Sequence, residues 1–220
     1  MPVIINNRRG ARNVTLRPKV GAHPEIHISK PWLTSTSFVL KFLESKRKWV
    51  EKVFAAVPQK SKIIPGEVLE IFGRKVNLVH DSNQRGNCYM DKDKTILCVG
   101  GGADMFERRV RDFIKSELMD EIKTIIKTVP REYWPKHITL RDTCSRWGSC
   151  STTGNMSFSW RLAFAPYDVM RYVVMHELAH TKHMDHSAAF WATVSSLYGF
   201  GVERAKRWLS QNGQSLHKYF

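Results

Sequence analysis

Eleven residues in the C-terminal part of the chain combine side chains that can hold a metal ion with one that can move a proton. They run from His176 to His186 and read His-Glu-Leu-Ala-His-Thr-Lys-His-Met-Asp-His. In a helix, His176 and His180 lie on the same face, one turn apart. Two imidazoles so placed can bind one zinc ion, each at about 2.0–2.1 Å. Glu177 lies about 100° further round the helix, where a carboxylate can act as general base on a water activated by the metal.

A catalytic zinc site usually takes three protein ligands, and two histidines are candidates for the third position. An uninterrupted helix would place His183 about 10 Å along the axis from His176, too far for one ion. The helix is therefore expected to end near His183, and the chain to turn back through Met184-Asp185. We take His186 as the predicted third ligand and keep His183 as the alternative.

The segment before these histidines is strongly apolar and predicts a buried helix over residues 168–182. Buried imidazoles and a buried carboxyl group raise the free energy of the fold unless something compensates them, and a metal ion does so. H-E-x-x-H also occurs by chance in helices that bind nothing. Because the helix is predicted to be buried, we favour a metal site over a chance occurrence of the motif, and the sequence predicts one Zn²⁺ per chain.

Length and composition indicate a globular protein of one large or two small domains. The chain has 220 residues, of which 42% are hydrophobic and 25% charged. It has no stretch of 18 apolar residues and no apolar segment of signal-peptide type at the start, so we expect a cytoplasmic protein with no membrane span. The four cysteines form no C-x-x-C pair and are predicted to be reduced thiols.

The net charge of +15 is unevenly distributed along the chain. Residues 1–60 hold twelve Lys and Arg against three Glu, whereas residues 61–100 are nearly neutral and residues 101–220 carry +5. Such a basic N-terminal part indicates a polyanionic partner, either nucleic acid, a nucleotide or the ribosome. The alternative is an ordinary solvated surface, and no known nucleic-acid-binding motif is present.

Hydrophobic periodicity predicts an α+β fold: an N-terminal β-rich subdomain, followed by a mixed sheet with helices that include the histidine helix. The expected strands cover residues 13–16, 25–29, 68–72, 75–79, 95–99, 137–141 and 155–161. The expected helices cover residues 35–57, 104–129, 168–182, 187–198 and 202–210. Gly100-Gly101-Gly102 predicts a turn and a joint between subdomains 1–100 and 101–220, unless the chain forms one continuous domain. Those glycines lack the G-K-[ST] of a phosphate-binding P-loop.

Three sequence blocks together resemble the YgjP-like metallopeptidase family. They are R-x-x-x-x-R-W-G-S-C-S at 141–151, G-N-M-S-F-S-W-R-L at 154–162, and Y-V-V-M-H-E-L-A-H-x-x-H-x-x-H-x-x-x-F-W at 172–191. The resemblance implies a bacterial, soluble, zincin-like hydrolase with zinc ligands His176, His180 and His186, and with Glu177 as catalytic base. Ser159 departs from the family pattern, where an Asn is expected.

The favoured hypothesis is a zinc metallopeptidase acting on peptide or protein substrates. Oxyanion stabilisation needs a second electrophile, for which Arg146 and the backbone around Gly148 are candidates. Trp147 is predicted to be a core residue rather than a substrate platform, and Cys150 a small buried thiol rather than an extra ligand.

Two alternatives remain open at this stage. One is a metal-dependent nucleotide phosphohydrolase (pyrophosphatase) that uses the same water-activating site. The other is a nucleic-acid- or ribosome-binding protein with a structural zinc, although such a closed site needs no base at Glu177.

Overall fold

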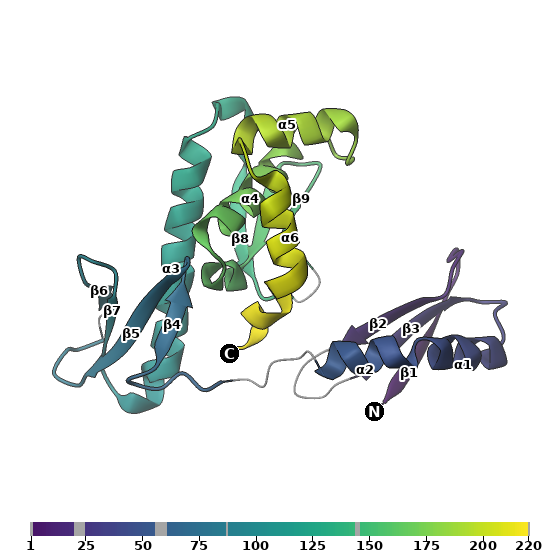
Figure 1. Ribbon diagram of the computed structural model, residues 1–220, viewed down its shortest axis with the longest axis horizontal. Coiled ribbons are helices and arrows are strands. Elements are labelled where there is room, and N and C mark those ends of the chain that lie inside the picture. Colours follow the sequence, from purple (N-terminus) through teal and green to yellow (C-terminus); the bar gives the residue numbers. More distant parts are fainter. Residues whose placement is uncertain (1, 20–24, 56–60, 87, 144–145, 220) are drawn as a thin grey trace. The chain divides into compact units, whose positions relative to one another are not determined.

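The chain divides into two compact units, Met1–Gln59 and Lys60–Phe220, in the computed structural model (Figure 1). The structure describes residues 2–19, 25–55, 61–86, 88–143 and 146–219. Each unit has a hydrophobic core of its own, and the two are described separately below.

The first unit is a three-stranded sheet with two helices on one face (Figure 1). Its strands lie in the order β1 (Val3–Arg8), β3 (Glu25–Pro31) and β2 (Thr15–Lys19). The central strand β3 pairs parallel with β1 and antiparallel with β2. Alternate residues of β3 are buried, as expected for a strand with one covered face. The small core is formed by β3 and by the helices α1 (Thr36–Ser45) and α2 (Arg47–Ala55).

The second unit is built around the long helix α3 (Phe106–Lys127). Its buried residues recur every three or four positions, which produces one apolar stripe. A four-stranded sheet packs against α3, with strand order β4 (Val68–Ile71), β5 (Arg74–Asp81), β7 (Ile96–Gly100) and β6 (Cys88–Met90). At the turn between β7 and α3, Gly101 has φ +91°, and a Cβ there would overlap the guanidinium of Arg109. The glycine run is therefore used for a turn, as predicted.

A smaller sheet and three helices complete the second unit and carry the H-E-x-x-H segment. The sheet has the order β8 (His137–Arg141), β10 (Asn155–Ser159) and β9 (Gly148–Cys150), with β10 parallel to β8 and antiparallel to β9. A fully buried 3-10 helix, Trp160–Phe164, leads to α4 (Tyr167–Ala179). Helices α5 (Ala188–Tyr198) and α6 (Val202–Asn212) pack on α4, and so does β9. The edge of this sheet thus lies beside the histidine helix.

The α+β class is confirmed, because the chain contains both strands and helices and their order does not repeat regular β-α-β units. The helix expected over residues 35–57 is divided at Lys46 into α1 and α2, and its predicted end at residue 57 lies outside the described residues. Three strands, β1, β6 and β9, were not predicted. The cysteines Cys88, Cys98 and Cys150 are free thiols, and Cys144 lies outside the described residues.

The boundary expected at residue 100 falls inside the second unit, between β7 and α3. Both elements contribute to one core, where Leu97 and Val99 of β7 and Val110 of α3 are all fully buried. We therefore propose Met1–Gln59 and Lys60–Phe220 as the domains of this chain. None of the helices in the described parts of the chain has the length and apolar character that crossing a membrane requires.

Candidate metal centre

Three imidazoles converge at the end of α4 and the segment that follows it. His176 lies in the last turn of α4, His180 caps that helix, and His186 comes from the connection to α5. One donor atom of each lies within 4.8 Å of those of the other two. The Nε2 atoms of His176 and His186 are 3.2 Å apart. Two tetrahedral zinc ligands would have nearly this separation, about 3.3 Å for metal–nitrogen bonds of about 2.05 Å.

Protein contacts fix the orientation of two of these rings. Nδ1 of His180 lies 2.8 Å from the backbone oxygen of His183, so that nitrogen carries a proton and Nε2 keeps a lone pair. Nδ1 of His176 lies 3.5 Å from the hydroxyl of Tyr172, one turn earlier on α4. Partners of this kind orient metal-binding histidines in proteins and set their tautomer.

A single aromatic ring, that of Phe190, packs against all three histidine rings. Phe190 is fully buried, and its ring centre lies 4.5 Å from that of His180, 4.9 Å from His176 and 4.7 Å from His186. The ring is stacked on His180 and edge-on to the other two. Trp191 lies against the same group, 5.7 Å from His176 and 5.9 Å from His186. The contribution of Phe190 was not recognised in the sequence, although F-W at 190–191 belongs to the motif.

The chain turns where the spacing required it to turn. The amide of His183 donates to the oxygen of Ala179, after which the helical pattern stops. Ser187 then caps α5 by accepting from the amide of Phe190, at 3.4 Å. Within the described residues, the donor cluster contains His186 and not His183, whose backbone oxygen holds His180 instead.

Burial controls the protonation of the site. Burial, with further effects of His180 and His186, lowers the pKa of His176 to about 4, so its imidazole is neutral and can donate a lone pair near pH 7. Burial raises the pKa of Glu177 to about 7, and the positive charge of Arg146 acts in the opposite direction. Glu177 is only 5% exposed, and its carboxyl group can therefore exchange a proton near neutrality.

Gly148, in strand β9, makes room for the Glu177 side chain. A Cβ at this position would come within 2.6 Å of both Cγ and Oε1 of Glu177. Any larger residue would displace the carboxyl group. Sequence reasoning considered Gly148 only as a backbone donor, and this steric role follows from the approach of β9 to α4.

The remaining candidates occupy different positions around the site. Arg146 is exposed and close enough to Glu177 to affect its pKa. Burial, and then the charge of Glu177, raise the pKa of the Cys150 thiol, and Cys150 is not among the clustered donors. Trp147 packs on the core beside His217, 5.5 Å between ring centres, as predicted for a core residue. The buried hydroxyl of Ser159 has no hydrogen-bond partner among the described residues.

The donor set fits a divalent metal such as zinc. It consists of three imidazole rings, each with one nitrogen in the cluster, and His186 is exposed, so one side is open to solvent. A cluster of imidazole donors next to a buried carboxyl group is the arrangement of a metal-dependent hydrolase.

The chain belongs to the YgjP-like family, because residues 12–212 match the family model described as "YgjP-like, metallopeptidase domain". The resemblance found in the sequence motifs is thereby confirmed. Membership identifies the chain as a metal-dependent hydrolase of the metallopeptidase type, with a divalent metal and peptide or protein substrates.

The chain is also similar to a solved structure, the crystal structure of the metallopeptidase zymogen abylysin of Pyrococcus abyssi. The two are 23% identical, the match covers 48% of this chain and 98% of that one, and the TM-score is 0.34. No curated protein matches the chain.

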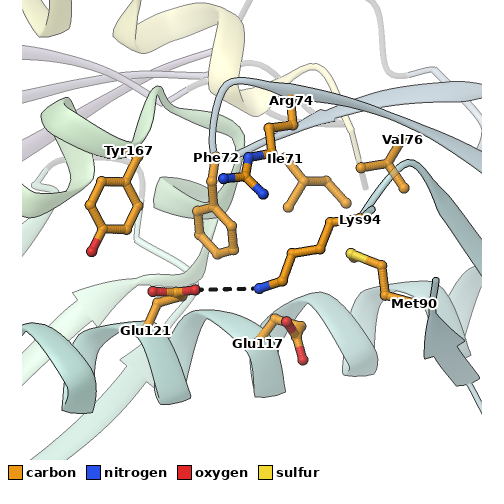
Figure 2. Close-up of a pocket in the computed structure, with 9 residues that line it drawn as sticks. All are labelled: Ile71, Phe72, Arg74, Val76, Met90, Lys94, Glu117, Glu121 and Tyr167. Atoms are coloured by element: carbon orange, nitrogen blue, oxygen red, sulfur yellow. Dashed lines mark ion pairs between the residues drawn. The ribbon is translucent and has the colours of Figure 1, made fainter. Parts of the chain in front are cut away.

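A separate small cavity of about 90 Å³ lies between α3 and the four-stranded sheet (Figure 2). Lys94 faces Glu121 across it at 3.8 Å. Phe72 and Lys94, which both line it, have positive φ angles of 50° and 55°. Tyr167, at the first residue of α4, lines it as well, about 13 Å along the helix axis from His176. The cavity is therefore distinct from the metal centre.

Proposed function

We propose that this chain is a zinc-dependent peptidase in which Glu177 is the general base and His176, His180 and His186 hold the metal. The observation that carries the proposal is the convergence of three imidazole nitrogens beside a buried carboxyl group. A zinc ion held there would supply a Lewis acid that polarises a carbonyl group and lowers the pKa of bound water to about 7.

The protein's own groups would then handle the proton and the charge. Glu177 would accept a proton from the attacking water and return it to the leaving amine, a role that suits a carboxyl group with a pKa of about 7. The charge of the bound metal would favour the carboxylate form, so Glu177 would be ready to act as a base near neutrality. Arg146 would stabilise negative charge that develops on the carbonyl oxygen of the substrate.

Strand β9 offers a place for an extended substrate. Trp147 accepts from the amide of Ser159, and the amide of Ser151 donates to Asn155, so these odd-numbered positions bond toward β10. The alternation of an antiparallel ladder directs the backbone groups of Gly148 and Cys150 to the other edge. A peptide could add to this edge as a further strand, which would place its backbone beside Glu177.

The proposal is tested with Glu177→Gln in purified protein loaded with one equivalent of zinc. We expect turnover of an unfolded protein or peptide library to fall by about 100-fold or more, because a positioned general base contributes about 10² to 10⁴. Metal content should stay at one per chain. Glu132→Gln, an exposed carboxylate paired with Lys182 at 3.8 Å, is the matched control and should keep full activity.

The same preparations distinguish the alternatives. Hydrolysis of nucleoside triphosphates without peptide cleavage would replace the peptidase proposal by phosphohydrolase chemistry. Turnover that Glu177→Gln leaves unchanged would contradict both enzyme readings and favour a structural zinc.

A further inference from the structure

The N-terminal unit has a large excess of positive charge that is not balanced near its groove. Residues 1–59 contain eleven Lys and Arg against three Glu. Two of these acids, Glu44 and Glu51, pair with Arg47 at 3.4 and 3.0 Å, and Glu25 lies 2.9 Å from His27. All three carboxylates thus contact basic side chains of the unit, and none of them lines the groove described next.

This groove lies among three segments of the unit: the loop after β1, the connection from β3 to α1, and the first turns of α1. It has a volume of about 630 Å³, in the range of ligand sites. Arg12, Pro31, Phe38 and Phe42 are among its walls, and no acidic residue lines it.

Exposed aromatic rings accompany the positive charge. Phe38 is 55% exposed and Trp32 is 62% exposed. The guanidinium of Arg9 lies over the Trp32 ring, 5.1 Å from its centre. Aromatic faces offered to solvent next to arginine side chains are the features with which proteins bind unpaired bases and the phosphates between them.

We propose that this groove, together with the pair formed by Arg9 and by Trp32, the residue after the groove's Pro31, binds single-stranded nucleic acid. Bases would stack on Phe38 in the groove and on Trp32 outside its lining, and Arg12 and Arg9 would hold the phosphates. A duplex would offer the same phosphates but would keep its bases stacked within the helix, so the exposed rings would gain nothing. An acidic peptide would match the charge but not the aromatic faces. The proposal concerns a surface of the N-terminal unit and does not depend on the peptidase activity.

The test measures fluorescence polarisation of a labelled oligothymidylate of twelve nucleotides with the full-length chain over a range of salt concentrations. Phe38→Ala should weaken binding by about ten-fold, since stacking on one aromatic ring contributes about 1–3 kcal/mol per base. Leu40→Ala is the matched control, because Leu40 lies on the same helix and is 56% exposed, and it should bind like the wild type.

A second pair of variants tests the charge. Arg9→Ala combined with Arg12→Ala should reduce the slope of log K against log salt by about 1.4, because each phosphate contact to a single strand contributes about 0.7. Lys46→Ala combined with Lys48→Ala removes the same charge from exposed positions outside the groove and should change the slope less. Glu177→Gln should bind the oligonucleotide like the wild type.

Three results would overturn the proposal. They are equal losses for the two double variants, equal affinities for Phe38→Ala and Leu40→Ala, and binding of duplex DNA or poly-glutamate as tight as that of the single strand. Each would show a diffuse cationic surface or a different partner instead of a stacking groove.

Discussion

Glu177 is a carboxyl group held where water hardly reaches it. Desolvation disfavours its ionised form, and among the described residues the charge of Arg146 acts in the opposite direction. The side chain packs so closely against Gly148 that a Cβ there would overlap it. The ionised form of Glu177 is therefore unfavourable in the folded chain, and a cation bound beside the carboxylate would stabilise it.

The metal-free protein should show this as a pH-dependent difference in stability between wild type and Glu177→Gln. The pKa of Glu177 is about 7 in the folded chain, against an ordinary value of 4.5. The folded state keeps a proton that the unfolded state releases, so the wild type loses stability as pH rises from about 4.5 to 7. Gln does not titrate, and the variant should become relatively more stable over this interval, by on the order of 3 kcal/mol.

Thermal melts in the presence of a chelator, at several pH values from 4.5 to 8.5, measure this difference. Histidine titration is common to both proteins and cancels in the comparison. A difference in melting temperature that stays constant across the interval would contradict the buried, protonated state of Glu177.

At this scale the sequence predicted the three histidines that converge in the structure and missed the aromatic residues that contact them. H-E-x-x-H and the position of His186 follow from helix geometry and the reach of one metal ion. The roles of Tyr172 and Phe190 do not, because aromatic residues at helical spacing ordinarily pack in a core. Only their distances to the histidine rings show the second role.

The end of helix α4 determines which histidine can take part. If the helix had continued, His183 would lie too far along the axis. It ends after Ala179, and the His183 oxygen then accepts a hydrogen bond from His180. His183 thus contributes through its backbone, which every amino acid possesses.

We therefore expect His183→Ala to keep one zinc per chain, whereas His186→Ala should lose most of its zinc at the same free-metal concentration. Metal analysis after dialysis against a weak chelator measures both variants side by side. The reverse pattern, with zinc lost from His183→Ala and retained by His186→Ala, would make His183 the third ligand.

Two of the strands that the sequence failed to predict, β6 and β9, are short. β9 has three residues, Gly148–Cys150, too few for a period-two pattern to be visible, and it becomes a strand only through pairing with β10. The division of the predicted helix at Lys46 is not visible in the sequence either, because apolar residues continue at helical spacing into α2. The long helix α3 shows the opposite case, because its stripe of buried residues is complete in the sequence.

At the scale of the whole molecule, the two units differ in the size of their hydrophobic cores. The core of the unit Lys60–Phe220 includes strands of both its sheets and four helices, with no residue before Ile63. The first unit buries Ile26, Ile28, Val39 and Val50. A core of that size is small for an independent domain.

A fragment of residues 60–220 should accordingly fold cooperatively and bind one zinc per chain. Circular dichroism melts and metal analysis of the fragment beside the full-length chain provide the measurement. We expect a melting temperature within a few degrees of the full-length value, with no more than about 1 kcal/mol lost. A fragment without a cooperative transition would show that the first 59 residues are needed for the fold of the second unit.

The buried Phe190 ring beneath the three histidines has a consequence for how the metal is kept. Phe190, Tyr172 and the His183 oxygen contact the histidine rings in the folded chain. The conformational entropy that ordering these rings costs is therefore lost when the chain folds, and not when a metal ion binds. Entry or departure of the ion then requires no rearrangement of the backbone. Occupancy becomes an equilibrium with the surrounding metal pool, so this centre would respond to metal supply throughout the lifetime of the protein.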